Sequence, residues 1–512
     1  MKIKTRFTWH NTTKRFSAQP QKYFEPENLK DLQDIVLEAE AKGIRVRAVG
    51  SGHSFSDVAL TNGYLVNPKK LNRQITIPPS WLSPDQRFRH KNLVYVEAGI
   101  KLQDFNKQMD VRGLCVENMG AVDEQTLAGA ISTGTHGTGI DLPAMSGMVR
   151  SIVIVAKGGT IYRIEPSAGL FDPEKYNEPG IKLVQDDKWF NAALVSLGCL
   201  GIIYAYVVEL KPMYWLEESK ELTTWSALKP KLENDLAHFL RTDSEGNPIR
   251  ALSILVNPYP NKDGTHSCLI NRHREVAEPQ KHRSWNERFR NLVSITLGGV
   301  FPFSYLFYRG TRVLNARFPG QMPGLIERSL KLLNDKVFIN KGHKVMYAGA
   351  EYIKLKAFDA EYAFDVQTNT KGFIHSVEQV MAKAKALAEA SQLFQTSPMG
   401  LRFVKASTAS LTPESGRDVC YVDTPVLLGT KGANAILDAY QDIFIQNGGV
   451  PHWGKVNNRF EGKQKLLKQH YTQLAEWEAV FHELNPNGTF SNNFSDRFGL
   501  GKLVYSEKSL EV

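Results

Sequence analysis

The stretch of sequence that decides the fold is residues 49–55, VGSGHSF, a loop of small residues around His53. Residues 28–43 before it carry apolar side chains at helical spacing and end at a glycine, which predicts an amphipathic helix. Residues 44–48 then alternate apolar and basic side chains, a pattern typical of a strand. We therefore expect a helix, a strand and a glycine-rich loop in that order.

A second stretch rich in glycine, residues 127–139, has the sequence LAGAISTGTHGTG. Small residues let backbone N–H groups approach an anion closely, and hydroxyl side chains add further donors. The hydroxyls here belong to Ser132, Thr133, Thr135 and Thr138. This combination suits a pyrophosphate, so the two loops are predicted to hold one dinucleotide.

The spacing of these loops disfavours two other kinds of nucleotide site. A Rossmann fingerprint needs G-x-G-x-x-G at the start of a helix and an acidic residue about 20 positions later, and neither loop is followed in this way. Residues 429–432, GTKG, lack the glycine, lysine and hydroxyl spacing of a P-loop. A nicotinamide cofactor is therefore disfavoured, and so is a P-loop.

The rest of the chain mixes predicted helices and strands, so the expected fold class is α+β. Strands are predicted at residues 93–98, 152–156, 161–164 and 202–210. The second and third of these are expected to pair with each other. Helices are predicted at residues 101–109, 189–197, 373–390, 432–447 and 461–484. From about residue 211 aromatic, proline and charged residues become more frequent, which predicts a second domain.

Composition places the chain among globular proteins, since 42% of its 512 residues are apolar and 23% are charged. The net charge of +10 comes from 63 basic and 53 acidic residues without a basic run, so no nucleic-acid partner is expected. The start of the chain lacks an apolar signal core, which favours a cytoplasmic location. The cysteines have no metal-ligand or disulfide spacing, so no metal site is predicted and buried thiols are expected: Cys115, Cys199, Cys268 and Cys420.

One segment raises the question of a membrane. Residues 291–308 contain no charge and are flanked by basic residues on both sides. Two glycines, a proline and a marginal length argue against a membrane span. A buried core segment is favoured over contact with a membrane surface.

Four strings of the sequence match a known family in order and spacing. They are RAVGSGHSFSD at residues 47–57, ENMGAVDEQTLAGAISTGTHGTG at 117–139, LGCLGII at 197–203 and PHWGKVN at 451–457. These strings resemble those of the aldonolactone oxidases, which include gulonolactone and arabinonolactone oxidases and bacterial alditol oxidases. The family belongs to the vanillyl-alcohol-oxidase-like flavoproteins. The resemblance is strong through the first 210 residues and weaker between about 213 and 351.

The resemblance implies an α+β fold with a PCMH-type FAD-binding domain and an α+β cap domain that binds the substrate. The expected boundaries are residues 1–212 for the FAD-binding domain and 213–450 for the cap. Residues 451–512 are expected to return to the FAD-binding domain. The flavin would then lie where the two domains meet, which is a common position for ligand pockets.

The resemblance also implies how FAD is held. In covalent members of the family the histidine matched by His53 is bonded to a methyl carbon of the isoalloxazine, and a histidine that only hydrogen-bonds the phosphates is the alternative. Gly120 matches a position near the reactive face of the flavin, where an absent methyl group would admit dioxygen. The other expected cofactor-binding residues are Gly50, Ser51, Gly52, Ser54, Phe55, Gly129, Ser132, Thr133, Thr135, His136, Gly137, Gly201 and Ile203.

Three residues are expected to act on the substrate. Lys455 matches the lysine of the family's HWxK motif, and Arg402 matches the arginine of its Glu-x-Arg pair. The chain departs from the family at Gly400, where sugar and polyol oxidases carry a glutamate. Asp423 is a candidate to supply the missing carboxylate, and so is Glu361, for which a structural salt bridge is the favoured role.

The function expected from these features is that of a covalent FAD oxidase. It would oxidise a hydroxyl of an aldonolactone, alditol or related small alcohol by hydride transfer to flavin N5, and dioxygen would be reduced to hydrogen peroxide. One alternative is a flavin oxidase for a hydrophobic alcohol such as a sterol or a lipid-linked sugar. Another is a flavin-binding protein with little turnover, because Gly400 removes a functional carboxylate.

Overall fold

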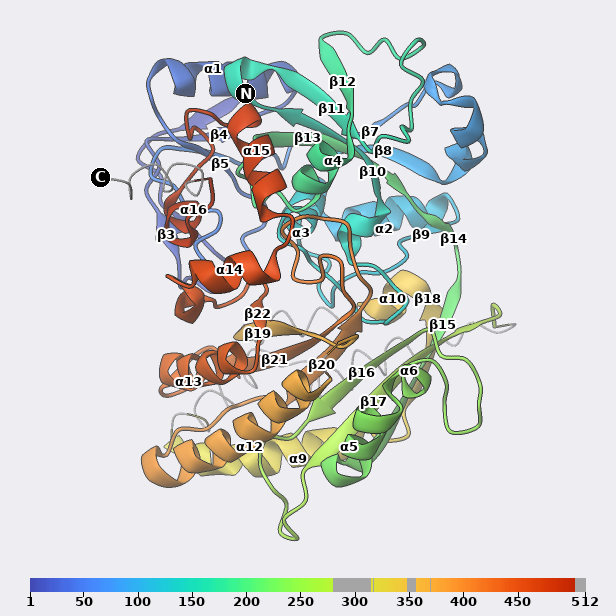
Figure 1. Cartoon of the computed structure of the whole chain (residues 1–512), viewed down its shortest axis with the longest axis vertical. Helices are drawn as coiled ribbons and strands as arrows, with labels where there is room; N and C mark the ends of the chain where they lie inside the picture. The colour runs from blue at the N-terminus through green and yellow to red at the C-terminus, as the bar shows by residue number, and fades with distance from the viewer. Residues whose placement is uncertain (280–314, 316, 348–355, 369, 502–512) are drawn as a thin grey trace.

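The computed structural model describes residues 1–279, 315, 317–347, 356–368 and 370–501 of the chain (Figure 1). The uncharged segment 291–308 lies outside these residues, so its burial stays a prediction. Among the described helices, none is long and apolar enough to cross a bilayer.

Two sheets form the amino-terminal part of the protein. The four-stranded sheet has the order β1 (Lys2–Lys4), β4 (Lys22–Glu25), β6 (Tyr64–Val66), β5 (Val46–Ala48). The six-stranded sheet has the order β12 (Ile181–Gln185), β11 (Ile161–Glu165), β10 (Val149–Val155), β13 (Ile202–Glu209), β8 (Leu93–Glu97), β7 (Gln74–Ile75). Two small ribbons pair β2 (Trp9–His10) with β3 (Ser17–Ala18) and β9 (Leu114–Cys115) with β14 (Lys211–Pro212). Besides α1 (Leu29–Ala41), the α-helices of this part are α2 (Leu102–Val111), α3 (Leu127–Ser132) and α4 (Asp187–Leu194).

The predicted helix, strand and loop unit is present at the start of this part. Helix α1 (Leu29–Ala41) begins after Asn28, whose side chain accepts a hydrogen bond from the Asp31 N–H at 2.8 Å and caps the helix. Strand β5 pairs in parallel with β6, and the loop of residues 49–55 leaves its carboxyl end. The buried face of α1 is made by Leu32, Ile35, Val36 and Ala39. This packing fixes the loop to a rigid layer.

An antiparallel eight-stranded sheet forms the second part, and seven of its strands are long enough to carry a row of side chains. Its order is β18 (Val337–Lys341), β15 (Trp215–Thr224), β17 (Ser267–Val276), β16 (Ala251–Val256), β20 (Met399–Val404), β21 (Val419–Leu427), β19 (Ala357–Asp365), β22 (Val450–Pro451). Every recorded pairing in this sheet is antiparallel. Partners in an antiparallel ladder point to the same face, so the register decides which side chains share a surface.

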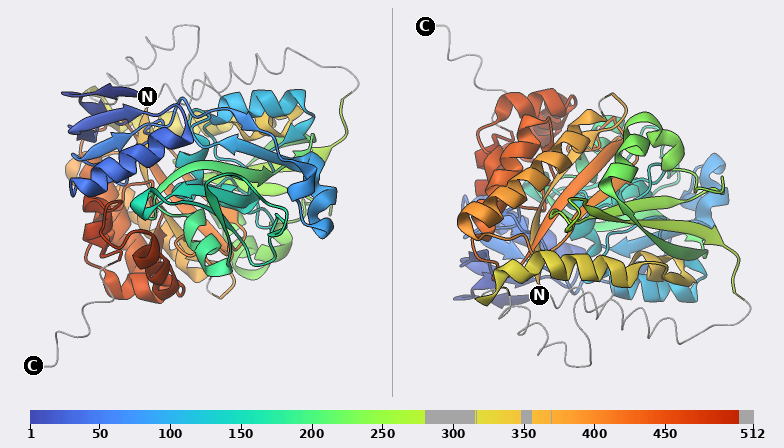
Figure 2. Two further views of the ribbon diagram at one scale, coloured as in Figure 1. Left: turned by 90° about the horizontal axis from the view of Figure 1, so that it is seen from above. Right: turned by 90° about the horizontal axis from the view of Figure 1, so that it is seen from below.

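Helices cover one face of this large sheet. Figures 1 and 2 show α9 (Met322–Leu333), α12 (Lys371–Ser391) and α13 (Ala433–Gln446) on the side away from the amino-terminal sheets. Helix α5 (Trp225–Asn234) also packs on this sheet, with the short helices α6 (Leu236–Phe239) and α10 (Gly342–Met346) near its edge. The other face of the sheet is therefore directed toward the glycine-rich loops.

The end of the described chain packs against the amino-terminal part. It forms α14 (Gln464–His470), α15 (Leu474–Leu484) and α16 (Asn493–Phe498). The N–H of Val46 donates to the carbonyl of Thr489 at 2.7 Å, and the Asn485 side chain donates to the carbonyl of Cys199 at 3.0 Å. The three domain boundaries expected from the sequence stay a prediction.

The sequence predicted most elements within a few residues, and two predictions were wrong in detail. The helix expected at 461–484 is broken between α14 and α15, where Tyr471 turns inward and stacks on Trp453 with ring centroids 5.5 Å apart. Residues 127–132 form helix α3 and not a loop, because Leu127, Ala130 and Ile131 are buried at helical spacing. The predicted pairing of 152–156 with 161–164 is confirmed by β10 and β11.

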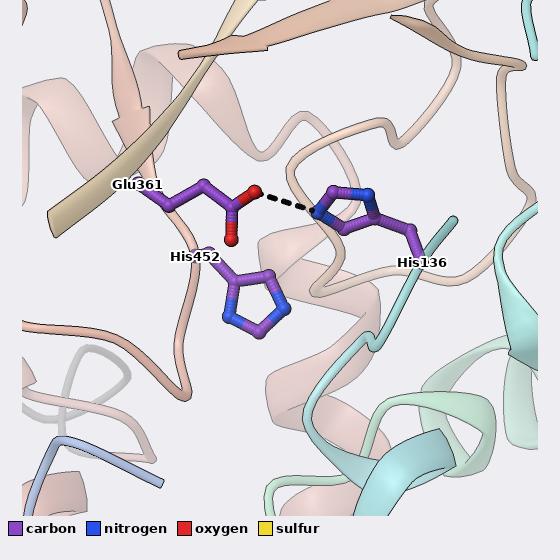
Figure 3. A group of neighbouring side chains, drawn as sticks. All are labelled: His136, Glu361 and His452. Atoms are coloured by element: carbon purple, nitrogen blue, oxygen red, sulfur yellow. Dashed lines mark ion pairs between the residues drawn. The ribbon is translucent and has the colours of Figure 1, made fainter. Parts of the chain in front are cut away.

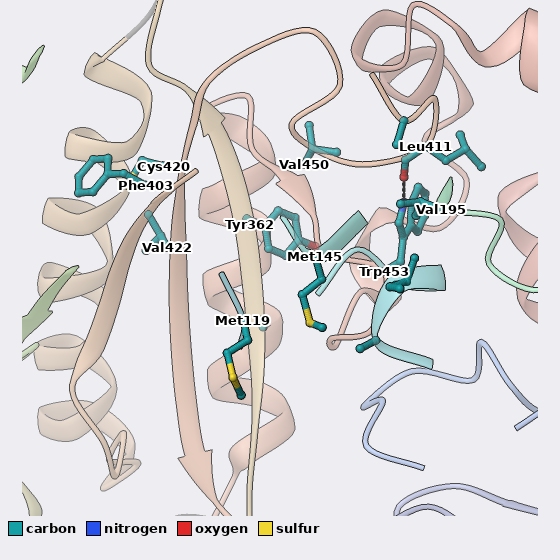
Figure 4. Packing of buried hydrophobic residues seen from close by; sticks show 14 of the residues in the cluster. Met119, Met145, Val195, Tyr362, Phe403, Leu411, Cys420, Val422, Val450 and Trp453 are labelled. Carbon is teal, nitrogen blue, oxygen red and sulfur yellow. Dashed lines mark hydrogen bonds between the residues drawn. The ribbon is translucent and has the colours of Figure 1, made fainter. Parts of the chain in front are cut away.

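The two parts share one hydrophobic core. Figure 4 shows Met119 and Met145 of the amino-terminal part close to residues of the large sheet such as Tyr362 and Val422. The buried Trp453 donates from its indole N–H to the carbonyl of Leu411 at 2.5 Å. The four cysteines are buried and free of disulfides, as expected. A continuous core holds the loops and the large sheet in fixed relative positions.

Candidate active site

A first cavity is enclosed by the loop of residues 49–55, helix α3 and the start of β13. Its empty volume, which includes the solvent at its open mouth, is about 950 Å³. Ten of the residues expected to bind the cofactor line it: Gly50, Ser51, Gly52, His53, Ser54, Gly129, Ser132, Thr133, Gly201 and Ile203. The structure thus brings together residues from three distant strings of the sequence.

The loop in this cavity leaves a row of hydrogen-bond donors unused. Within the described part of the chain, the backbone N–H groups of residues 50–54 donate to no protein acceptor, whereas Val49 and Phe55 on either side donate to Val66 and Gly454. The Ser51 hydroxyl is also buried without a partner. No Asp or Glu is among the described residues that line the cavity. Free N–H groups without a nearby carboxylate bind anions, so the cradle fits the pyrophosphate of FAD.

Arg47 braces this cradle and was not among the expected site residues. Its guanidinium donates to the carbonyls of Val58, Leu197 and Phe490, the last at 2.8 Å. The side chain is only 2% exposed, so it ties three segments together from inside the protein. A basic residue in an apolar strand was the available signal in the sequence.

A second cavity continues from the first. The two share four lining residues, among them His53, so this histidine lies at their junction. Burial lowers the pKa of His53 to about 4, with a smaller contribution from Lys101, and its imidazole is therefore neutral at pH 7. Its Nε2 lies 4.0 Å from a carboxylate oxygen of Glu124. A neutral imidazole retains the lone pair that a covalent bond to a flavin methyl carbon requires.

The remaining cofactor-binding candidates divide between cavities. Phe55, Gly120, Thr135 and His136 line the second cavity. Gly137 does not line either of the two, because it packs against Asn118 and Met119. A Cβ at Gly137 would lie 2.0 Å from Asn118 Oδ1, so this glycine permits a close approach between chain segments.

Five charged side chains from the large sheet and the turn after β22 line the second cavity. Lys455 Nζ donates to Asp359 Oδ2 at 2.7 Å and lies 3.2 Å from Glu361 Oε2. Arg402 Nη2 lies 3.7 Å from Asp423 Oδ2. The three expected catalytic residues are thus close together, and Asp359 is a fourth that was not expected. Its signal in the sequence is the pair of acids at alternate positions, 359 and 361, of an apolar strand.

The neighbours of these groups set their protonation. Burial raises the pKa of Asp359 to about 6, although Lys455 opposes the shift. Burial also raises the pKa of Asp423. At Glu361 burial acts in the same direction, but the charge of Lys455 and the interaction with His136 outweigh it and hold the pKa well below its usual range. Burial therefore favours the protonated form of Asp359 and Asp423, which makes these two the better proton acceptors among the three carboxylates.

The geometry around Gly400 shows which residue takes the place of the glutamate that sugar and polyol oxidases carry at this position. Gly400 and Asp423 are direct partners in the ladder between β20 and β21. A Cβ at Gly400 would lie 2.3 Å from Asp423 Oδ1, so the aspartate occupies the space above the glycine. The neighbouring strand therefore supplies a carboxylate beside Arg402.

Behind this cluster lies a group of two histidines and a glutamate (Figure 3). His136 Nε2 is 3.4 Å from Glu361 Oε1, and the ligand atoms of His136, Glu361 and His452 lie within 4.8 Å of one another. Such a donor set can hold a divalent cation. Here Glu361 already faces Lys455, and the His136 ring stacks on Tyr421 with centroids 3.8 Å apart. An ion pair that orients Glu361 is the simpler account of the group.

Known proteins share both the sequence pattern and the fold. Residues 20–165 match the model of the FAD binding domain, and residues 256–498 match the model of D-arabinono-1,4-lactone oxidase. A putative D-arabinono-1,4-lactone oxidase of Neurospora crassa is 32% identical over 97% of this chain and 86% of its own length. The L-gulono-1,4-lactone dehydrogenase of Mycobacterium tuberculosis is 27% identical over 96% of this chain and 98% of its own. A solvent-stable cholesterol oxidase has the same fold, with a TM-score of 0.72 at 13% identity and 98% coverage of both chains.

The fold and the cradle define this protein as a flavoenzyme with a PCMH-type FAD-binding fold. The expected fold class is confirmed. The Neurospora crassa relative is 32% identical to this chain over nearly the whole length of the chain, so the chain belongs to the D-arabinono-1,4-lactone oxidase family. The resemblance inferred from the four strings is therefore confirmed.

Proposed function

We propose that the protein oxidises a hydroxyl group of an aldonolactone or a closely related small alcohol, with dioxygen as the acceptor and hydrogen peroxide as the second product. The observation that carries the proposal is the cluster of Lys455, Arg402 and three carboxylates in the cavity that continues from the FAD cradle. Oxidation of an alcohol needs a proton acceptor and cations that balance developing negative charge. The cluster contains both.

FAD, when bound, accepts the hydride that leaves the alcohol carbon. The free N–H groups of residues 50–54 and the Ser51 hydroxyl would hold its pyrophosphate. Gly201 and Ile203 would lie beside the adenine and ribose. His53 would carry the covalent bond, since it is a neutral imidazole at the junction of the two cavities.

The charged residues then have distinct roles. Arg402 would bind the lactone and hold the reacting hydroxyl. Asp423 would accept the hydroxyl proton, because burial raises its pKa and it lies beside Arg402. Lys455 stays protonated, since Asp359 and Glu361 outweigh burial and raise its pKa, and it would balance negative charge on the reduced cofactor. Glu361 is a positioning residue that holds Lys455 between itself and Asp359.

The choice of dioxygen rests on Gly120, which lines the second cavity. A Cβ there would lie 3.0 Å from the Thr135 methyl carbon, so even an alanine would reduce the space in the cavity beside this residue. The relatives include proteins named as oxidases and proteins named as dehydrogenases, and the glycine supports the oxidase. We also propose that the protein is located in the cytoplasm.

The two alternatives receive less support from the site. A sterol or another hydrophobic alcohol needs an apolar pocket, whereas the second cavity carries five charged side chains on one wall. A flavin-binding protein without turnover was motivated by the absent carboxylate at Gly400, and Asp423 occupies that place.

The proposal is tested by mixing the purified flavoprotein with D-arabinono-1,4-lactone, L-gulono-1,4-lactone and xylitol without oxygen. We expect at least one lactone to bleach the oxidised flavin band and air to restore it with one hydrogen peroxide per turnover. If no lactone or alditol reduces a flavin that dithionite can reduce, the proposed activity is wrong. If reduction occurs but only an artificial dye reoxidises the flavin, the dioxygen assignment is wrong.

A further inference from the structure

A third cavity adjoins the second on the same face of the large sheet. Its empty volume is about 680 Å³, and it shares Ala121 and Arg402 with the second cavity. It reaches from Arg402 across strands β16, β17 and β15. We call it the distal compartment, because Arg402 separates it from the cluster around Lys455.

The register of the sheet places residues of both cavities on the same face of the sheet. Asp423 pairs with Gly400, two residues before Arg402 on β20. Arg402 in turn pairs with Ser253 on β16, and Ser253 pairs with Asn271 on β17. Partners in an antiparallel ladder share a face, so one polar row runs from the catalytic carboxylate across the sheet to the distal compartment.

The side chains of the distal compartment can both accept and donate hydrogen bonds. Asn271 Nδ2 donates to Glu218 Oε1 at 3.2 Å, while Asn271 Oδ1 is buried without a hydrogen-bond partner. His273 Nε2 lies 3.7 Å from Glu218 Oε1. An unsatisfied buried acceptor is unfavourable, and a hydroxyl of a ligand would satisfy it.

We propose that the distal compartment binds a hydroxylated extension of the substrate, either a side chain of two or more hydroxylated carbons or a glycosyl group on the lactone. This inference rests on the proposed function. Alternating acceptors and donors, with a carboxylate among them, match the hydroxyl groups of a sugar and do not match an apolar tail. The lactone ring sits at Arg402 and Asp423, and its extension reaches Asn271.

The first test uses the native protein and a series of substrates. The series is D-arabinono-1,4-lactone with one exocyclic carbon, L-gulono-1,4-lactone with two, and the lactone of a disaccharide aldonic acid. We expect kcat/KM for flavin reduction to rise along the series by about 3- to 10-fold for each added hydrogen bond. Equal or falling values along the series would overturn the inference while leaving the lactone oxidase intact. Failure of all three to reduce the flavin would overturn both.

The second test separates the compartment from the catalytic cluster. Asn271→Leu removes the amide while nearly keeping its size, and we expect kcat/KM for the best extended lactone to fall by about 3- to 10-fold. The five-carbon lactone should change by less than about 2-fold. The control is Asn261→Leu, because Asn261 donates to Thr265 and Ser267 near the end of the same hairpin and does not line the compartment.

A binding measurement does not depend on turnover. With the flavin reduced by dithionite and oxygen excluded, calorimetry gives the dissociation constant of each lactone. Asn271→Leu should weaken binding of the extended lactone alone, with thermal unfolding unchanged relative to Asn261→Leu. An equal loss for short and extended lactones would show a general structural defect and would overturn the assignment of Asn271.

Discussion

Replacing Gly400 by alanine should displace the Asp423 carboxylate, which we propose as the proton acceptor, without changing Asp423 itself. The new Cβ would lie 2.3 Å from Asp423 Oδ1 and 3.0 Å from its Cγ. Backbone movement is restricted because the two residues are partners inside an eight-stranded sheet. The aspartate side chain must therefore rotate away, and its 3.7 Å approach to Arg402 is lost.

Two losses are expected, one in stability because the new Cβ crowds Asp423, and one in rate because Asp423 is the proposed proton acceptor. Overpacking costs about 1–3 kcal/mol of stability, which leaves the protein folded. Loss of a positioned proton acceptor costs about 10²- to 10⁴-fold in rate. We expect the rate of flavin reduction by saturating lactone to fall in this range, measured by stopped-flow absorbance without oxygen. Gly324→Ala is the matched control, since nothing lies within 4 Å of the added Cβ.

Combining Gly400→Glu with Asp423→Ser tests directly whether the two residues compete for one space. Gly400→Glu alone should also be slow, and the gain that the family pattern predicts for it is not expected, because Asp423 already fills the space. In Gly400→Glu combined with Asp423→Ser the space is vacated, and we expect faster flavin reduction than in Asp423→Ser alone. A Gly400→Ala protein that reduces its flavin at the native rate would refute the assignment of Asp423.

Three further outcomes are expected. Acid precipitation should leave yellow flavin on the native polypeptide and none on His53→Ala, and colour released from the native protein would refute the covalent bond. Protonation of Asp359 removes its negative charge beside Lys455, so the flavin reduction rate should fall as the pH drops through about 6, and this limb should be absent in Asp359→Asn. Gly120→Ala places a methyl group 3.0 Å from Thr135 and should slow reoxidation by dioxygen by about 10-fold or more while reduction by lactone changes little, as shown by separate measurement of the two half-reactions.

The sequence predicted the cradle well because its requirements are local. Free N–H groups around an anion need small residues in one short run, and residues 49–55 and 127–139 carry that pattern. Of the five charged residues on one wall of the second cavity, four were candidates from the sequence and Asp359 was not. Asp359 lies about 40 residues from Arg402 in the chain, and only the pairing of β19, β21 and β20 brings them to one wall.

The break between α14 and α15 has a similar cause. Helical spacing of apolar residues continues through residues 461–484, and nothing in that spacing distinguishes a straight helix from two shorter ones. At the break Tyr471 stacks on Trp453, which lies outside the predicted helix. Helix α3 was missed for a different reason, since its helical spacing is local and was read as a glycine-rich loop.

The pairing of Gly400 with Asp423 also bears on how substrate-binding carboxylates can change position during evolution. Two partners in an antiparallel ladder project side chains into one volume, so an acid lost from one strand can be replaced from the other. An alignment read column by column would score this chain as lacking the family's acid. In this sheet the pair of Gly400 and Asp423, and not either residue alone, determines that a carboxylate lies beside Arg402.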